Sequence, residues 1–292
     1  MRSAVGQTKL SQTHFHLQPP ACKLQAVFLF LCTGQGEEHM EPISVVIITF
    51  NEEQNIRNCI LSVQGIASEV LILDSGSADN TVRIAKALGA RVETHPFDGH
   101  IQQKNRAKDM ASHEWVLSLD ADERLSPLLA ESIANVMENP QAAGYTMNRL
   151  NHYCKKPIKG CGWYPDTKLR LWKKTAGAWG GVNPHDRFEL HQGGPEHIKG
   201  DILHFTYNSR EEMKSQSKKF ARIAAREFMK LPWHYLIFKL LFSPISKFFK
   251  TFFLQRGLLE GINGLEVGWY QTREVFHKYA LAIAYKFTHT EP

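Results

Sequence analysis

Short apolar runs alternate with amphipathic segments from residue 43 onward. The first run, residues 43–49 (ISVVIIT), is rich in β-branched residues and is typical of a strand that is buried on both faces. Residues 51–63 have apolar residues at helical spacing, which predicts a helix. The same pattern continues with strands expected at 69–73, 90–94 and 115–119 and helices at 81–88, 101–111 and 127–137. This alternation predicts an α/β domain with a mainly parallel, Rossmann-like sheet and helices on both faces.

Three loops follow these strands at the edge of the sheet where ligands bind in such folds. They open at Phe50, Asp74 and Asp120. They carry acids in place of the glycines with which a dinucleotide fold (G-x-G-x-x-G) or a P-loop (G-x-x-x-x-G-K) holds phosphates. A sugar-1-phosphate nucleotidyltransferase should also have a glycine-rich, basic first loop. The sequence therefore argues against all three classes of nucleotide-binding protein.

The acidic segment 120–123 (DADE) directly follows the fourth predicted strand. Asp120 and Asp122 are two residues apart, so both carboxylates can face one cleft. They would supply the hard oxygen ligands that Mg²⁺ or Mn²⁺ needs beside a diphosphate. Such a pair alone is more typical of a solvated turn, but its place in the alternating series favours a metal and diphosphate site.

Charge is distributed unevenly along the 292 residues. The chain has 35 Lys and Arg against 29 Asp and Glu, a net charge of +6. Residues 210–292 hold 14 of these basic residues and 7 of the acidic ones, a net +7, which leaves −1 for the rest. Because residues 1–209 are nearly neutral, the charge distribution argues against general nucleic-acid binding. The basic, aromatic tail indicates contact with an anionic surface such as a membrane or, as an alternative, a solvated helical face.

Two segments of this tail have helical patterns, residues 211–231 and residues 236–254. The second mixes many Phe and Leu residues with Lys239, Lys247 and Lys250, as a helix lying on an anionic bilayer would require. Packing as a helical appendage is the competing explanation. No run reaches the roughly 18 uninterrupted apolar residues that a membrane span needs.

Residues 1–39 precede the regular pattern. Their apolar segment 24–32 is similar to the core of a signal peptide, but the segment before it is long for a targeting peptide and no small-residue cleavage site follows. Because Met40 stands just before the first strand, we expect residues 1–39 to be a disordered extension or translation from a misassigned start codon. Five irregularly spaced cysteines fit neither a disulfide framework nor a zinc ribbon and indicate a reducing compartment.

Three motifs give the chain a resemblance to a known family. They are residues 45–53 (VVIITFNEE), 71–81 (LILDSGSADNT) and 120–123 (DADE). Together they resemble the inverting glycosyltransferases of family 2, which have the GT-A fold. Finer details are similar to the bacterial subgroup that adds glucose to the inner core of lipopolysaccharide, and these lie at 103–107 (QKNRA), 170–172 (RLW) and 183–186 (NPHD). The resemblance implies a GT-A domain over residues 40–209, followed by a basic helical region over residues 210–292.

The resemblance also implies roles in binding a nucleotide-sugar donor. Phe50 would stack on the base, and Asp74 would accept a hydrogen bond from the base imide N–H. Glu52 would help at the ribose. Asp120 would lie near the ribose and the metal, and Asp122 would coordinate a Mg²⁺ or Mn²⁺ ion that bridges the diphosphate.

Two cations and a possible base complete the predicted site. Lys104 and Arg106 would neutralise the diphosphate or are surface cations. Inversion requires a base that takes the proton of the acceptor hydroxyl, and this base should follow the acidic pair in the chain. There the chain has His185-Asp186, where many family members have a His-Glu or Glu-Asp pair. We predict Asp186 as the base, with His185 as its orienter or the second choice, and a structural His-Asp pair as the alternative.

The sequence thus predicts a metal-dependent hexosyltransferase. We expect it to move glucose from UDP-glucose to a lipopolysaccharide-core acceptor at the cytoplasmic face of the bacterial inner membrane, in peripheral contact with anionic lipid. One alternative is transfer to another lipid-linked acceptor, a polyprenyl phosphate or capsule precursor. The other is a catalytically silent GT-A scaffold, which would release no nucleoside diphosphate from a donor.

Overall fold

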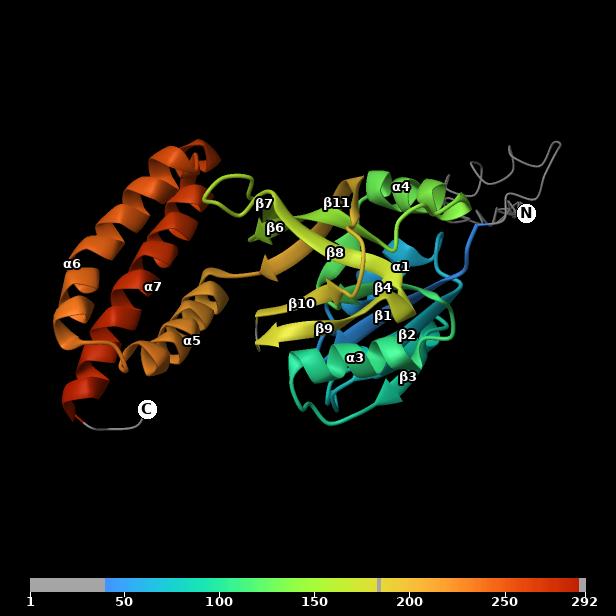
Figure 1. Ribbon diagram of the computed structural model, residues 1–292, viewed down its shortest axis with the longest axis horizontal. Coiled ribbons are helices and arrows are strands. Elements are labelled where there is room, and N and C mark those ends of the chain that lie inside the picture. Colours follow the sequence, from blue (N-terminus) through green and yellow to red (C-terminus); the bar gives the residue numbers. More distant parts are fainter. Residues whose placement is uncertain (1–39, 183–184, 289–292) are drawn as a thin grey trace, which may run out of the picture. The chain divides into compact units, whose positions relative to one another are not determined.

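The computed structural model describes residues 40–182 and 185–288, and of Val182 and His185 it describes the backbone alone. The prediction for residues 1–39 concerns a segment outside the described residues. The chain forms a large mixed sheet, a separate two-stranded hairpin and a group of C-terminal helices (Figure 1).

The first half of the sheet contains the strand–helix units that the sequence predicts. Its parallel strands lie in the order β3-β2-β1-β4, so β1 is central between β2 and β4. The strands are β1 (Ile43–Thr49), β2 (Glu69–Asp74), β3 (Arg91–Thr94) and β4 (Trp115–Asp120). The helices between and after them are α1 (Ile56–Val63), α2 (Thr81–Ala87), α3 (His100–Met110) and α4 (Pro127–Glu138). These predictions are confirmed, except that the first helix begins at Ile56 and not at Asn51.

The second half of the sheet is mixed, and the alternating pattern does not predict it. Strand β8 (Asp166–Lys173) pairs antiparallel with both β4 and β6 (Gly144–Tyr153), which links the two halves. Strand β11 (Glu196–Tyr207) then runs parallel to β6 and antiparallel to the short β5 (Glu123–Leu125). Strand β7 (Lys156–Pro157) extends β6, while β9 (Gly177–Val182) and β10 (His185–Leu190) form the separate hairpin.

Apolar residues fill both faces of this sheet. On one face Ile47, Ile60 and Leu129 belong to a large cluster between the sheet and helices α1, α2 and α4. On the other, Trp172 and Phe188 belong to a smaller cluster together with residues of α3. The rings of Trp172 and Phe188 stack 3.8 Å apart, which fixes the hairpin β9–β10 against β8. The two apolar clusters pack on opposite faces of the strands whose ends carry the acidic motifs.

The C-terminal helices begin at Arg210. They are α5 (Arg210–Phe228), α6 (Trp233–Phe249), the single π-helical turn η3 (Lys250–Leu254), the 3₁₀ turn η4 (Gly257–Glu260) and α7 (Gly261–Thr288). A further 3₁₀ turn, η2 (Lys174–Ala176), lies between β8 and β9. Within the described part of the chain, no helix is both long and apolar enough to cross a membrane.

Side chains join these helices to the sheet. The buried Tyr153 at the end of β6 donates a hydrogen bond to Glu266 Oε2 of α7 at 2.7 Å, and Arg210 pairs with the other oxygen of Glu266. The backbone amides of Lys159 and Gly160 both donate to Glu260 Oε1. Since bonds cross residue 210, the division into two domains there remains a prediction.

Candidate active site

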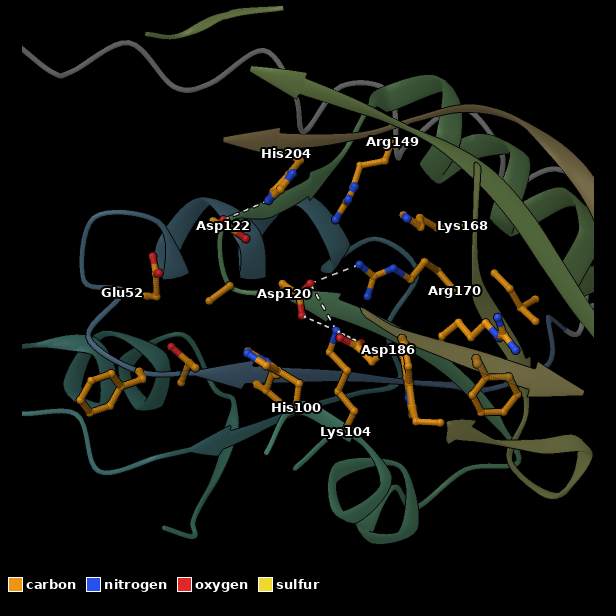
Figure 2. Close-up of a pocket in the computed structure, with 18 of the residues that line it drawn as sticks. Glu52, His100, Lys104, Asp120, Asp122, Arg149, Lys168, Arg170, Asp186 and His204 are labelled. Atoms are coloured by element: carbon orange, nitrogen blue, oxygen red, sulfur yellow. Dashed lines mark hydrogen bonds and ion pairs between the residues drawn. The ribbon is translucent and has the colours of Figure 1, made fainter. Parts of the chain in front are cut away.

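A cavity of about 780 Å³ opens at the carboxyl ends of β1 and β4 (Figure 2). It is the place that the parallel order of the strands predicts for a ligand. Its walls come from the loop after β1, the end of β4, the strands β6, β8 and β11, helix α3 and the hairpin β9–β10. The predicted site residues among its lining are Phe50, Glu52, Lys104, Asp120, Asp122 and Asp186.

Hydrogen bonds hold the loop after β1 against the loop after β2. The amide of Asn51 donates to Ser77 Oγ, and Asn51 Oδ1 accepts from the amide of Ala78. In the same way the amide of Glu52 donates to Thr81 Oγ1 at 2.8 Å. Residues 51–55 are therefore a loop and not the start of α1. This loop presents Phe50 to the cavity with 58% of its surface exposed, as a ring that stacks on a ligand requires.

Asp74 and Arg106 are placed away from the cavity. Asp74 is 2% exposed, and its carboxylate accepts hydrogen bonds from the amides of Gly76 and Ser77 and from the Ser77 hydroxyl. In this structure Asp74 therefore shapes the turn that carries Ser75 into the cavity lining. Arg106 points to Asp98, with Nη2 2.9 Å from the Asp98 carboxylate. Their predicted contacts with the donor have no support in these positions.

Lys104 connects three distant parts of the chain. It lies on α3, is 5% exposed and places Nζ 3.1 Å from Asp120 Oδ1 and 2.9 Å from Asp186 Oδ2. Asn105 fixes the hairpin beside it, because its side-chain amide exchanges two hydrogen bonds of 2.9 Å with the backbone of Trp179. Lys104 thus holds the first acid of the motif and the predicted base beside each other (Figure 2).

Asp120 also contacts a buried arginine. Arg170 Nη2 lies 3.2 Å from Asp120 Oδ2 and 2.9 Å from Glu123 Oε1, and Glu123 is completely buried. Burial raises the pKa of Asp120, but the charges of Lys104 and Arg170 outweigh burial and hold that pKa well below its usual range. Asp120 is therefore ionised and already paired with two cations.

Asp122 faces His204 across the mouth of the cavity. His204 comes from β11, and its Nε2 lies 3.2 Å from Asp122 Oδ2 (Figure 2). Its Nδ1 lies 2.6 Å from Asn151 Oδ1, while Asn151 Nδ2 donates to the carbonyl of Trp163, so the amide presents its oxygen to His204. The contact with Asn151 thus orients the ring so that Nε2 faces the Asp122 carboxylate.

Glu52 lines the same cavity as Asp122. Burial raises the pKa of Glu52, and the nearby carboxylates of Asp122 and Glu212 raise it further against a hydrogen bond from Asn55. An additional positive charge near Glu52 and Asp122 would therefore stabilise the ionised form of Glu52. Among the residues that the structure describes, no group of three or more His, Cys, Asp or Glu side chains is arranged to hold a metal ion.

The sequence reasoning did not assign roles to His204, Arg149, Arg170 and Glu123, although all four contribute to the site. The sequence does contain a signal for Arg170, because a charged residue between Leu169 and Leu171 in an apolar strand must find a partner inside the fold. His204 had none that the sequence makes visible, because its place opposite Asp122 depends on the pairing of β11 with β5 and β6. The side chain of His185 is outside the described residues.

Comparisons with known proteins show the family of this chain. The family described as "Glycosyl transferase family 2" matches residues 44–188. An uncharacterised glycosyltransferase of Rickettsia typhi is 31% identical, over 77% of this chain and 81% of that protein. The lipopolysaccharide core biosynthesis glycosyltransferase LpsC of Rhizobium meliloti is 25% identical, over 82% of this chain and 94% of that protein. Among solved structures, glucosyl-3-phosphoglycerate synthase of Mycobacterium tuberculosis is 26% identical with a TM-score of 0.33, over 38% of this chain and 44% of that one.

Proposed function

Since this chain belongs to glycosyltransferase family 2 and has a GT-A fold, we propose that it is an inverting hexosyltransferase. We infer UDP-glucose as the donor and a lipopolysaccharide-core saccharide as the acceptor, in line with the resemblance of residues 103–107, 170–172 and 183–186 and with the similarity to LpsC. The observation that carries the proposal is that one cavity brings together Phe50, the acids Asp120 and Asp122, and Asp186 of the hairpin β9–β10.

The residues at the mouth of the cavity fit a divalent cation, Mg²⁺ or Mn²⁺. Asp122 and His204 would hold it, because a carboxylate oxygen and an imidazole nitrogen, which lie 3.2 Å apart here, are both common ligands of divalent cations. Asp120 would act from beside the ion, since both its oxygens are already paired with Lys104 and Arg170. When bound, the cation would supply the charge that stabilises the departing nucleoside diphosphate.

The remaining steps use the chain's own residues. Phe50 would stack on the base of the donor, with Glu52 near its ribose. Asp186 would take the proton of the acceptor hydroxyl as that oxygen attacks the anomeric carbon from the face opposite the leaving group, which inverts the configuration. The ion pair with Lys104 fixes the position of the Asp186 carboxylate for this transfer.

We also propose that the protein acts at the cytoplasmic face of the inner membrane, in contact with anionic lipid. On α6 the residues Phe238, Leu241, Phe242, Ile245 and Phe249 recur at helical spacing, and all have more than half of their surface exposed. Residues 230–259 contain five Lys and Arg and no Asp or Glu. An exposed apolar stripe among cations alone favours an anionic bilayer interface over a second protein surface.

Binding and slow hydrolysis of a panel of UDP-, GDP-, ADP- and dTDP-sugars would test the enzyme proposal, with Mn²⁺ or Mg²⁺ present and after chelation. We expect one donor to bind in a metal-dependent way and Asp122→Ala to lose that binding. Asp109→Ala is the matched control, because Asp109 is an exposed acid on α3 outside the cavity. A folded protein that binds no donor and releases no nucleoside diphosphate would contradict the proposal and favour the scaffold.

A further inference from the structure

One wall of the cavity is lined by cations from strands β6 and β8. Arg149 of β6 and both Lys168 and Arg170 of β8 line it. Figure 2 shows these three side chains on one side of Asp120 and Glu52 on the other. The cavity therefore has an acidic end, where Glu52 and Asp122 lie, and a basic end.

The acidic partners of Arg149 and Lys168 do not line the cavity. Arg149 and Lys168 both pair with Asp166, while Arg149 and Arg170 both pair with Glu123. Neither Asp166 nor Glu123 is among the residues that line the cavity. A ligand at the basic end therefore meets Arg149 and Lys168, whose counterions do not line the cavity, beside Arg170, which also pairs with Asp120 inside it.

One nitrogen of the Arg170 guanidinium, Nη1, donates no hydrogen bond within the described part of the chain. The residue is 3% exposed. A guanidinium N–H that is buried without an acceptor is costly, and an anionic oxygen is the strongest acceptor that it can meet. A third guanidinium, that of Arg187, lines the same cavity and is largely exposed.

The donor diphosphate does not account for these cations. In the proposed function the diphosphate lies at the acidic end, beside Asp122 and His204, whereas the acceptor approaches Asp186. We propose that the basic wall of Arg149, Lys168 and Arg170 binds an anionic group, a phosphate or a carboxylate, that the acceptor saccharide carries. This proposal rests on the proposed function. The wall would then select acceptors by charge and orient the attacking hydroxyl toward Asp186.

Calorimetric titration with three monosaccharide probes tests this proposal and separates the two sources of the anion. Glucose 6-phosphate supplies a phosphate, glucuronate supplies a carboxylate, and glucose is the neutral control. Each is titrated with and without saturating UDP and Mg²⁺. We expect at least one of the anionic probes to bind about tenfold more tightly than glucose, and to bind together with the nucleotide. Equal affinities for all three probes would overturn the proposal.

Lys168→Gln is the test variant, because Lys168 is partly exposed and its loss should leave the fold intact. We expect the affinity for the preferred anionic probe to fall about tenfold. Lys173→Gln is the matched control, since Lys173 lies on the same strand outside the cavity and should change nothing.

Competition decides the remaining outcomes. If UDP displaces the anionic probe, or if Lys168→Gln weakens UDP as much as the probe, the cations serve the donor and the proposal is wrong. A failure of UDP to bind at all would contradict the proposed function instead. The titrations without nucleotide would still report on the basic wall.

Discussion

The candidate site depends on buried charges that satisfy one another. Lys104 pairs with Asp120 and Asp186, and Arg170 pairs with Asp120 and Glu123. Such networks tolerate the loss of one member poorly, because the remaining charges stay buried without a partner. The sequence identifies the two aspartates and Lys104 as candidates, but their mutual pairing follows from the three-dimensional fold alone.

Replacing Lys104 should disable the proposed transfer. In Lys104→Met the carboxylates of Asp120 and Asp186 lose their shared cation, so they repel each other and the base loses its fixed position. We expect the turnover rate to fall by about 100-fold or more. The measurement is release of nucleoside diphosphate with acceptor present. Lys108→Met, on the same helix but outside the cavity, should stay close to wild type, and a Lys104→Met enzyme within a few-fold of wild type would contradict the role of Lys104.

Glu69 gives the stability of the protein a predictable dependence on pH. Its carboxylate is mostly buried, which raises its pKa, but hydrogen bonds from Ser44 and Ser112 and the pairing with Arg91 outweigh burial and lower it. A depressed pKa in the folded state stabilises the protein above the pKa of the unfolded state, about 4.3 for glutamate, and this stabilisation is lost as the pH falls through the folded value.

Urea unfolding of wild type and Glu69→Gln at several pH values measures this contribution. We expect the wild type to be more stable near pH 6 and the difference to shrink steadily below about pH 4. The same charge is removed from an exposed site in Glu131→Gln, which controls for net charge. A difference that grows on acidification would have the wrong sign and refute the interpretation.

The elements divide into those that the sequence predicts and those that it does not. Strands β1 to β4 and helices α1 to α4 are predicted because each strand is a short apolar run and each helix has a regular apolar stripe. Strand β11 reads EHIKGDILHFTY, which has neither pattern, and its neighbours are brought together by pairings across long sequence distances. The acids after β4 could therefore be found from the sequence, whereas His204 on β11 could not.

Gly200 of β11 is one position where the contact between two elements leaves no room. Its φ is +101°, and a Cβ placed there would lie 2.5 Å from the backbone nitrogen of Leu129 in α4. Gly200→Ala should therefore lower the free energy of unfolding by about 2 kcal/mol or more, through both strain and overpacking. Denaturant unfolding checks this value. Gly65→Ala, with nothing within 4 Å of the added methyl group, should stay within about 0.5 kcal/mol of wild type.

The molecule as a whole combines a packed catalytic part with helices that expose many apolar side chains. Exposed Phe and Leu residues on α6 and η3 cannot be explained by the core, because the interior of the helical group is already filled by Leu236, Ala225, Tyr279 and Ala282. The sequence predicts this amphipathic character over residues 211–231 and 236–254, whereas the structure has α5 at Arg210–Phe228, α6 at Trp233–Phe249 and a further helix, α7, that the pattern does not predict. The sequence does not tell which side chains remain exposed, because that depends on how α5, α6 and α7 pack together.

Binding to vesicles tests the proposed membrane contact. We expect the protein to float with liposomes that contain anionic lipid, less with neutral ones, and less as the salt concentration rises. Leu241→Glu combined with Phe242→Glu should abolish flotation, since both side chains lie on the exposed stripe of α6. Leu128→Glu, an equally exposed apolar position on α4, should not. Self-association without lipid binding would show that a second copy covers this face.

The pairing of Lys104 with Asp186 has a consequence for the order in which the protein becomes functional during synthesis. The ribosome makes the chain from its N-terminus, so Lys104 and Asp120 are present long before Asp186 is added. A nascent chain that stops before β10 holds the acidic motif but not the proposed base, and its Lys104 has only one of its two carboxylates. The ion pair between Lys104 and Asp186 can therefore form only after Asp186 has been made, so an unfinished chain lacks the proposed base.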